Sequence, residues 1–386
     1  MRGWATDSPP IGAAVHPAQS AAMPLPALPA RLLRPLGLAF WPLLLALLLA
    51  GGPAWAAPVQ LLTQARMLPL VPGQAADWNR ATPVQLPDDW ATSRPAQQGV
   101  VAYRLALAAP AADAAGSTLH GLSIERACSV LAVWLNGQMI HDGGRFDEPV
   151  SRQCHRPQLV AVPAALLQPD GNVLELRIRG YALAEVSSRQ RAGGLSAVVF
   201  GAFDTVAAHH ARQLLFAIRL PEVLSGALVL MGSFMFVMGW FNRAQSYLAY
   251  FGALMVGWSL LLARLWASDL PVSNGTAELV LASLMAFITL ATVQFLMRYA
   301  GHRLRWLDLA LPAQCLLMPA TLLALGPQRL QMASSLWYAA LSAQAVAAAV
   351  FYLVQARRQR SRLVWPMAAL LGVVAVSLLV ELIALG

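Results

Sequence analysis

Ionisable side chains gather directly after an Asn136-Gly137 pair in the first half of the chain. Such side chains can bind a polar ligand through hydrogen bonds and ion pairs, and loops at the end of a β-sandwich often carry function. The sequence therefore offers this stretch as a ligand site, with a solvated loop as the alternative. The residues concerned are His141, Asp142, Arg145, Asp147 and Glu148.

Aromatic residues could add stacking to this chemistry. Four of them either form a platform for a sugar ring or pack in the core, since large aromatic side chains dominate sandwich cores. The ring of Trp134 is expected to face outward, because its position is out of phase with Val133 and Leu135, and it joins the candidates for ligand binding. The four are Trp78, Trp90, Tyr103 and Trp134.

No set of residues predicts catalysis or a metal centre. The pairs Asp88-Asp89 and Asp147-Glu148 are adjacent in sequence, and adjacent carboxylates rarely converge on one substrate atom. The histidines lack the Cys and His spacing of metal ligands. We therefore expect no catalytic residue, metal or cofactor in this chain, and whether a longer protein is an enzyme stays open.

Cys128 and Cys154 are expected to form a disulfide. Both fall in the region expected to be exported, where an oxidising compartment allows nearby cysteines to bond. The bridge would close a loop around the Asn136-Gly137 hairpin and stabilise the fold by roughly 3 kcal/mol in the chain-entropy model. The third cysteine, Cys315, lies in an apolar segment.

Residues 57–211 show the pattern of an all-β domain. In Val173–Arg179, apolar and charged residues alternate, which is typical of a half-buried strand. The strand Val130–Leu135 leads into Asn136-Gly137, a pair that favours a type I′ hairpin because both positions need positive φ. Several short strands of this kind predict a β-sandwich or jelly roll.

Four stretches of this region occur in an order that resembles a known fold. The series is similar to the galactose-binding-type jelly roll of family 2 glycosidases. It also resembles the extracellular domains of bacterial seven-transmembrane receptors with diverse intracellular signalling modules. The resemblance implies a carbohydrate-like ligand and an output by a histidine kinase, as in two-component systems, or by a diguanylate cyclase. The stretches are Leu86–Trp90, Val101–Arg104, Val133–Gly137 and Pro169–Ile178.

The N-terminal segment has the features of an export signal. Two arginines precede the apolar run Leu36–Ala50, and the small-residue motif Ala54-Trp55-Ala56 follows it. We expect a signal peptide over residues 1–56 that is cleaved after Ala56, with an uncleaved anchor as the alternative. Translation from Met23 would give a more ordinary signal. Residues 1–22 are then either a misplaced start or an extension.

Apolar segments dominate the rest of the chain. Only 12% of the residues are charged, against about 25% in an ordinary soluble domain. After a connector at residues 212–222, six segments approach the length of about 20 residues that a bilayer core demands. They predict an α-helical transmembrane bundle over residues 223–386. The segments are Val223–Phe241, Tyr247–Ala267, Leu279–Met297, Leu307–Leu325, Met332–Val354 and Val364–Leu385.

The arginines of the connecting loops predict an orientation. Loops 242–246, 298–306 and 355–362 hold eight arginines, whereas loops 268–278 and 326–331 hold one. Cytoplasmic loops carry the positive excess, so the β-domain is expected in the periplasm of a bacterial inner membrane. This agrees with the export signal. All basic residues are scattered arginines and form no basic face, which argues against nucleic-acid binding.

Two ionisable residues lie near the expected outer ends of apolar segments. Arg264 belongs to the second segment and Glu381 to the sixth. Intramembrane charges are candidates for function by default. The two side chains either reach the membrane surface separately or pair and join two helices.

These features predict a membrane receptor that detects an extracytoplasmic small-molecule ligand and passes the signal through its helices, acting as a homodimer. Six helices return the chain to the outside, whereas the receptors that it resembles have seven helices and a cytoplasmic module. The chain is therefore expected to be truncated before a seventh helix and its effector. A complete protein without output is the alternative. Other functions are a membrane transporter, and a membrane-tethered protein that binds or processes carbohydrate.

Overall fold

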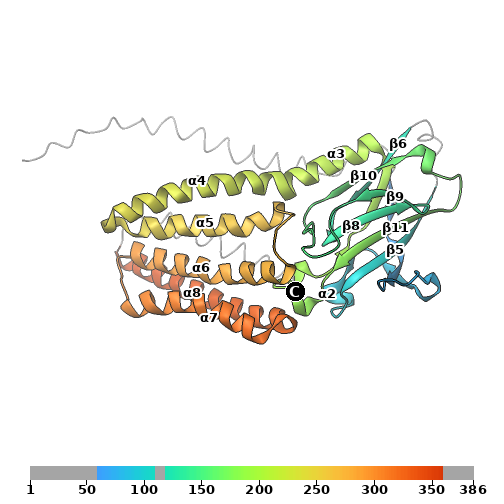
Figure 1. Cartoon of the computed structure of the whole chain (residues 1–386). Coiled ribbons are helices and arrows are strands. Elements are labelled where there is room, and N and C mark those ends of the chain that lie inside the picture. Colours follow the sequence, from blue (N-terminus) through green and yellow to red (C-terminus); the bar gives the residue numbers. More distant parts are fainter. Residues whose placement is uncertain (1–58, 109–117, 360–386) are drawn as a thin grey trace, which may run out of the picture. The chain divides into compact units, whose positions relative to one another are not determined.

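The computed structural model describes residues 59–108 and 118–359 (Figure 1). Strands fill the first part, and long helices follow from Phe203 onward. The predicted signal peptide over residues 1–56, the alternative start at Met23 and the sixth apolar segment, Val364–Leu385, lie outside the described residues.

Two larger antiparallel sheets form the β-region. The six-stranded sheet has the order β3-β2-β5-β11-β8-β9, and the four-stranded sheet has the order β1-β13-β6-β10. The first sheet comprises β2 (Gln64–Pro69), β3 (Thr82–Gln85), β5 (Gly99–Leu107), β8 (Val130–Leu135), β9 (Gln138–Asp142) and β11 (Asn172–Gly180). The second comprises β1 (Gln60–Leu62), β6 (Leu119–Ile124), β10 (Gln158–Pro163) and β13 (Val198–Ala202).

A small third sheet and short helical turns complete the β-region. Its order is β4-β12-β7. The strands are β4 (Asp88–Asp89), β7 (Ala127–Cys128) and β12 (Gly194–Leu195). The turns are η1 (Trp78–Arg80), α2 (Trp90–Ser93), η3 (Ala164–Leu166), η4 (Leu183–Glu185) and η5 (Arg189–Arg191).

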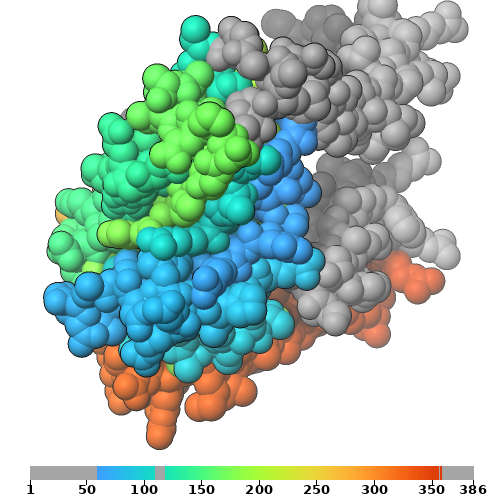
Figure 2. Space-filling model, turned by 90° about the vertical axis from the view of Figure 1, so that its right-hand side faces the viewer, coloured from blue at the N-terminus to red at the C-terminus, as the bar shows by residue number. Residues whose placement is uncertain are grey.

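Alternation of apolar and polar residues builds the sheets as expected. In β11, Leu174, Leu176 and Ile178 are fully buried in one core cluster with residues of both larger sheets, such as Leu122 of β6. The two sheets therefore enclose a common core, and the predicted β-sandwich is confirmed. Paired strands need not be neighbours in sequence, as the pairing of β1 with β13 shows. In the space-filling view, blue residues accordingly lie against green residues (Figure 2).

The predicted hairpin between β8 and β9 is also confirmed. Asn136 and Gly137 have φ angles of 50° and 86°, and Leu135 pairs with Gln138 across the turn. Positive φ at both central residues is what a type I′ turn requires.

A buried hydrogen-bond network links two of the sequence stretches that define the fold. The Trp90 indole donates to the Tyr103 hydroxyl at 2.8 Å, and this hydroxyl donates to Asp88 Oδ2 at 2.7 Å. Burial and the Asp88 carboxylate raise the pKa of Tyr103, so its hydroxyl stays protonated as a donor. Trp90 and Tyr103 are fully buried, and of the two alternatives for these aromatics, core packing holds for this pair.

The helices begin directly after β13, without the connector expected at residues 212–222. A helix of 39 residues runs from Phe203 to Phe241, made up of α3 (Phe203–Leu214), a π-helical turn η6 (Leu215–Arg219) and α4 (Leu220–Phe241). Proline has no backbone N–H to donate, and the π-turn directly precedes the turn that contains Pro221. The helix therefore continues through Pro221 and through the expected connector. Its first part, α3, packs on β6, β10 and β13.

Four further helices follow, and their sequence limits match the predicted segments within a few residues. Helix α4 packs on α5, α5 on α6, and α6 on both α7 and α8 (Figure 1). They are α5 (Tyr247–Trp266), α6 (Asn274–Tyr299), α7 (Arg305–Leu325) and α8 (Leu330–Gln359), with short turns η7 (Arg243–Gln245) and η8 (Pro327–Arg329) between them.

Small residues allow α4 and α5 to approach closely. A Cβ atom on Gly252 of α5 would collide with backbone atoms of Gly232 and Phe236 in α4, and one on Gly239 would collide with the backbone of Ala249. Close approach at small residues is typical of helix packing in lipid, where van der Waals contact replaces the hydrophobic effect.

The described residues include five helices that are long and apolar enough to cross a membrane. Their large apolar side chains point outward: Leu230 is 77% exposed, Leu309 76% and Phe241 83%. Contiguous apolar surface of this kind is rare on water-soluble monomers, which fits a multi-pass membrane protein.

The network around Tyr103 yields a first prediction. Tyr103→Phe should lower the free energy of unfolding by about 1–3 kcal/mol, because it leaves a buried indole N–H unpaired and removes a donor to Asp88. Thermal unfolding of the detergent-solubilised chain, followed by tryptophan fluorescence, measures this. Tyr247→Phe, a matched change outside the network, should shift stability by less than about 0.5 kcal/mol; equal effects of the two changes would argue against the network.

Candidate functional site

A buried cluster of charges joins the loops of the β-region to helix α6. The carboxylate of Glu278 has no exposed surface, and the side chains of Arg152 and Arg191 are 4% and 5% exposed. Arg152 donates to Glu278 Oε1 at 2.5 Å, and Arg191 donates to the same oxygen at 3.3 Å. We call these three residues, with Ser187, the Glu278 cluster.

The second oxygen of Glu278 is satisfied from the β-region as well. Ser187 donates to Oε2 from its backbone N–H at 2.9 Å and from its hydroxyl at 2.6 Å. The carboxylate thus accepts hydrogen bonds from two guanidinium groups, a hydroxyl and an amide. A buried charge is tolerated in a protein only when it is paired and hydrogen-bonded in this way.

Separate elements position the members of the Glu278 cluster. Arg152 lies in the loop between β9 and β10, and Arg191 ends the turn η5. Glu278 lies near the start of α6, whose N-cap Ser273 accepts from the Thr276 N–H, and the positive end of a helix dipole favours a carboxylate there. Arg152 also donates to the side chain of Asn274 at 2.5 Å.

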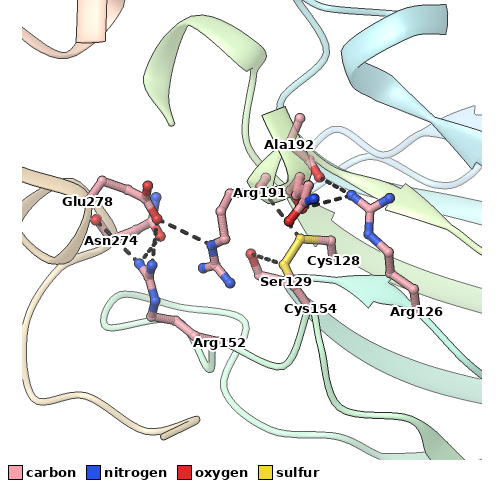
Figure 3. The surroundings of a disulfide bond; sticks show 10 residues. Arg126, Cys128, Ser129, Arg152, Cys154, Arg191, Ala192, Asn274 and Glu278 are labelled. Atoms are coloured by element: carbon pink, nitrogen blue, oxygen red, sulfur yellow. Dashed lines mark hydrogen bonds and ion pairs between the residues drawn. A yellow bond between two sulfur atoms is a disulfide. The ribbon is translucent and has the colours of Figure 1, made fainter. Parts of the chain in front are cut away.

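A disulfide holds the loop that carries Arg152 (Figure 3). The structure joins Cys154 to Cys128 of β7, and the carbonyl of Arg191 lies 3.5 Å from the Cys128 sulfur. The backbone N–H of Gln153 donates to the Ser129 carbonyl at 2.7 Å. The crosslink therefore fixes the Arg152 loop to β7, beside which the Arg191 carbonyl lies.

Polar contacts around the Glu278 cluster extend the joint. The hydroxyl of Ser151 donates to Asp269 at 2.7 Å, and the backbone N–H of Arg152 donates to the Ser268 carbonyl at 2.7 Å. Glu148 accepts from the backbone N–H of Asn274 at 3.2 Å. The β9–β10 loop thus contacts the connection between α5 and α6 over several residues.

Positive charge exceeds negative charge near the Glu278 cluster. Burial lowers the pKa of His155 to about 3, and four arginines act in the same direction: Arg191, Arg264, Arg126 and Arg152. Burial and the neighbouring Arg152 also lower the pKa of Arg191 to about 10, although Glu278 opposes this. His155 is therefore neutral at pH 7, while Arg191 stays charged.

The structure separates the ligand-binding candidates of the sequence. The Trp134 ring lies on the outer side of β8 beneath Arg177, whose guanidinium carbon is 4.2 Å from the ring centre. Burial lowers the pKa of His141, and Asp142 accepts from the N–H of Gly144. Arg145 lies 4.0 Å from Asp269 of the α5–α6 connection, and the exposed Asp147 lies 3.9 Å from Arg179. Binding by these five residues stays a prediction, and none of them lines the cavity formed by Arg126, His155 and helix α3.

The outer-face aromatics are covered by arginines. Arg104 lies over Trp78 at 3.7 Å from the ring centre, and Glu175 bridges Arg104 and Arg177. Unlike Trp90 and Tyr103, the rings of Trp78 and Trp134 are therefore half-buried by cations rather than by the core.

The pairing of Arg264 with Glu381 stays a prediction, because Glu381 lies outside the described residues. Arg264 itself acts electrostatically on His155 and Arg191, so it belongs to the surroundings of the Glu278 cluster. Sequence reasoning missed the cluster itself: Arg152, Arg191 and Glu278 are far apart in sequence, and no local motif joins them. The only available signal was a glutamate at the edge of an otherwise smooth apolar segment.

The Glu278 cluster holds no chemistry for catalysis. Its carboxylate is saturated by donors, so it is not free to accept a proton from a substrate or to attack one. Within residues 59–108 and 118–359, no three His, Cys, Asp or Glu side chains gather closely enough to hold a metal ion. What the arrangement can do is couple the position of the β-region to that of α6.

No protein-family model and no curated protein matches this chain. Among solved structures, the chain has a weak likeness to a glycosyl hydrolase family 2 member from Bacteroides cellulosilyticus, with 12% identity and a TM-score of 0.29 over 37% of this chain and 20% of that one. The Faecalibacterium prausnitzii beta-glucuronidase gives 17% identity and 0.28 over 37% and 31%. The chain thus spans a third or less of these enzymes, and TM-scores of this size do not establish a shared fold.

Removing the charge of Glu278 should weaken the fold strongly. Glu278→Gln leaves Arg152 and Arg191 buried without a counter-charge, and breaking a buried ion pair costs about 3–5 kcal/mol. Glu222→Gln is the matched control, because Glu222 pairs with Arg219 at an exposed site, where a pair contributes about 0–1 kcal/mol. Melting temperatures in detergent compare the two; similar small shifts would show that the cluster does not hold the joint.

Acid should weaken the fold through His155. The folded-state pKa of about 3 lies below the unfolded value near 6.5, so the unfolded chain binds a proton that the folded chain refuses. The resulting stability is present above pH 6.5 and is lost as the pH falls toward 3. His155→Gln should flatten the dependence of the unfolding free energy on pH in this window by up to about one proton. Denaturant titrations at pH 7 and pH 5 measure the unfolding free energy of the wild type and the variant. The same change with pH in both proteins would contradict this assignment.

Proposed function

We propose that this chain is the sensing part of a bacterial inner-membrane receptor. In this proposal the β-region is a jelly roll that faces the periplasm and binds a small molecule. The helices carry the signal across the membrane toward an output of the histidine kinase or diguanylate cyclase type. The observation that carries the proposal is the Glu278 cluster, which ties the β-region to the start of a membrane-spanning helix.

The chemistry of the joint supports transmission rather than anchoring alone. A surface contact between a domain and a helix bundle could slide without much cost. A buried carboxylate held by two arginines has few alternative arrangements, because breaking one pair leaves an unpaired charge. A shift of the β9–β10 loop or of η5 would therefore have to move α6 or switch the ion pairs. A ligand that prefers one of two such arrangements shifts their populations by its difference in affinity.

At its other end, α6 makes polar contacts with α7 that such a movement would disturb. There Asp308 of α7 accepts from Gln294 at 3.0 Å and from Arg298 at 2.9 Å, both on α6. Arg298 also stacks on Tyr250 of α5, at 4.8 Å from the ring centre. Helix α6 therefore has a polar connection at each end, and the expected orientation places the second one at the cytoplasmic side.

Hydrogen exchange of the full chain in lipid nanodiscs tests the coupling. Arg152→Gln should speed amide exchange by about tenfold in the α5–α6 connection and also at the far end of α6, around residues 290–299, because a loosened joint lowers local stability along the helix. Arg145→Gln is the control: it removes a neighbouring but exposed arginine, 4.0 Å from Asp269. Faster exchange confined to the loop, with the far end unchanged, would contradict transmission through α6.

The orientation is tested separately by cysteine labelling in a Cys315→Ala background. A membrane-impermeant maleimide added to spheroplasts should label Ala96→Cys in the β-region and leave Gln245→Cys, in the α4–α5 connection, unlabelled. The reverse pattern would place the β-region in the cytoplasm and remove the receptor proposal.

A further inference from the structure

A cavity of about 580 Å³ lies where the first long helix passes the β-region. Its wall combines Arg126 and His155 of the β-region with Arg212, Gln213 and Phe216 of α3 and η6. Ligand sites are typically concave spaces of about 300–1,000 Å³, so this cavity has the size for a small molecule. None of the sequence-derived candidates for ligand binding lines it.

The polar wall of the cavity is cationic. Arg126 and Arg212 line it together with one carboxylate, that of the exposed Glu125. Arg126 uses one terminal nitrogen to donate to the carbonyls of Gln190 and Ala192. A guanidinium carries five N–H donors, so donors of Arg126 remain for an oxyanion.

Further cations lie behind this wall. Cys154 and His155 line the cavity, and Arg152, Arg191 and Arg264 all act on His155. Of the carboxylates, Glu278 is already shared by Arg152 and Arg191. An anion bound in the cavity would lie close to these cations.

The opposite wall of the cavity is apolar and continues into the membrane-spanning part. It includes Ala217 of the π-turn, Pro221 of α4 and Leu265 of α5. Phe216 is 59% exposed beside it. π-Helical turns inside helices frequently occur at functional sites. A ligand here would meet cations at one end and hydrocarbon at the other.

We infer that this cavity binds the phosphate group of an organic phosphate. The inference rests on the proposed function in that it names the ligand class of the sensing part. The same chemistry has two sources, a soluble phosphate ester and the head group of an anionic phospholipid. Arginine forks match phosphate oxygens, and the apolar part of the wall accepts the start of an acyl chain.

Native mass spectrometry of the full chain in detergent tests the inference. Dioleoyl phosphatidylglycerol should bind about tenfold more tightly than dioleoyl phosphatidylcholine. Arg126→Gln should weaken the preference several-fold, because it removes one of the two arginines that line the cavity. Ala217→Trp should abolish it while keeping every charge, because the indole fills the cavity, so a folding defect of Arg126→Gln cannot alone explain both results. Arg80→Gln, which removes an exposed arginine outside the cavity, should bind like the wild type.

Competition with soluble glycerol 3-phosphate separates the two sources. Full displacement of the lipid identifies a free phosphate ester as sufficient, and no displacement identifies the lipid as the ligand; either result supports the site. Equal binding of the two lipids without binding of glycerol 3-phosphate overturns the inference, and so does a preference that survives Ala217→Trp. Lipid binding and hydrogen exchange in α6 are independent measurements. A negative result for the ligand site therefore leaves the proposed coupling untouched, and a negative result for the coupling leaves the ligand site untouched.

Discussion

The arrangement of this molecule depends on one buried carboxylate. Glu278 belongs to a helix of the membrane-spanning part, yet all its hydrogen-bond donors come from the β-region. Burying an ion is expensive unless every lone pair is used, so the cluster fixes the distance and the rotation between the two parts more strictly than apolar packing would. The disulfide and the surrounding loop contacts serve to hold the two arginines where this one group needs them.

The kinds of side chain that are buried and exposed differ on the two sides of this joint. The sandwich places its apolar side chains inside and its charged ones outside, as water demands. Helix α4 differs: it buries Ser225, Gly232 and Gly239 and exposes large apolar residues such as Leu230, Phe234 and Trp240. A polar joint between the two parts is physically reasonable, because each buried charge in it is paired and hydrogen-bonded.

The sequence revealed the features that are encoded locally. Alternation in β11, the Asn136-Gly137 turn and the limits of the apolar segments follow from periods of two residues, from φ preferences and from bilayer thickness, so they can be read from neighbouring positions. The Glu278 cluster and the cavity beside Arg126 could not be predicted in this way. Their residues come from loops separated by more than a hundred positions in part, and only the folded chain brings them together. The ligand candidates after the hairpin illustrate the same limit, since polar composition alone does not say whether a loop meets a ligand, solvent or another part of the protein.

The unbroken helix from Phe203 to Phe241 has a mechanical consequence. At 1.5 Å per residue, its 39 residues extend for about 58 Å, roughly twice the thickness of a bilayer core. Its first 12 residues, which form α3, pack on the four-stranded sheet, so the sandwich is attached directly to this helix. In a bilayer, a tilt of this helix by a few degrees would displace the sandwich sideways by several ångströms. A lateral force on the sandwich would in turn tilt the helix.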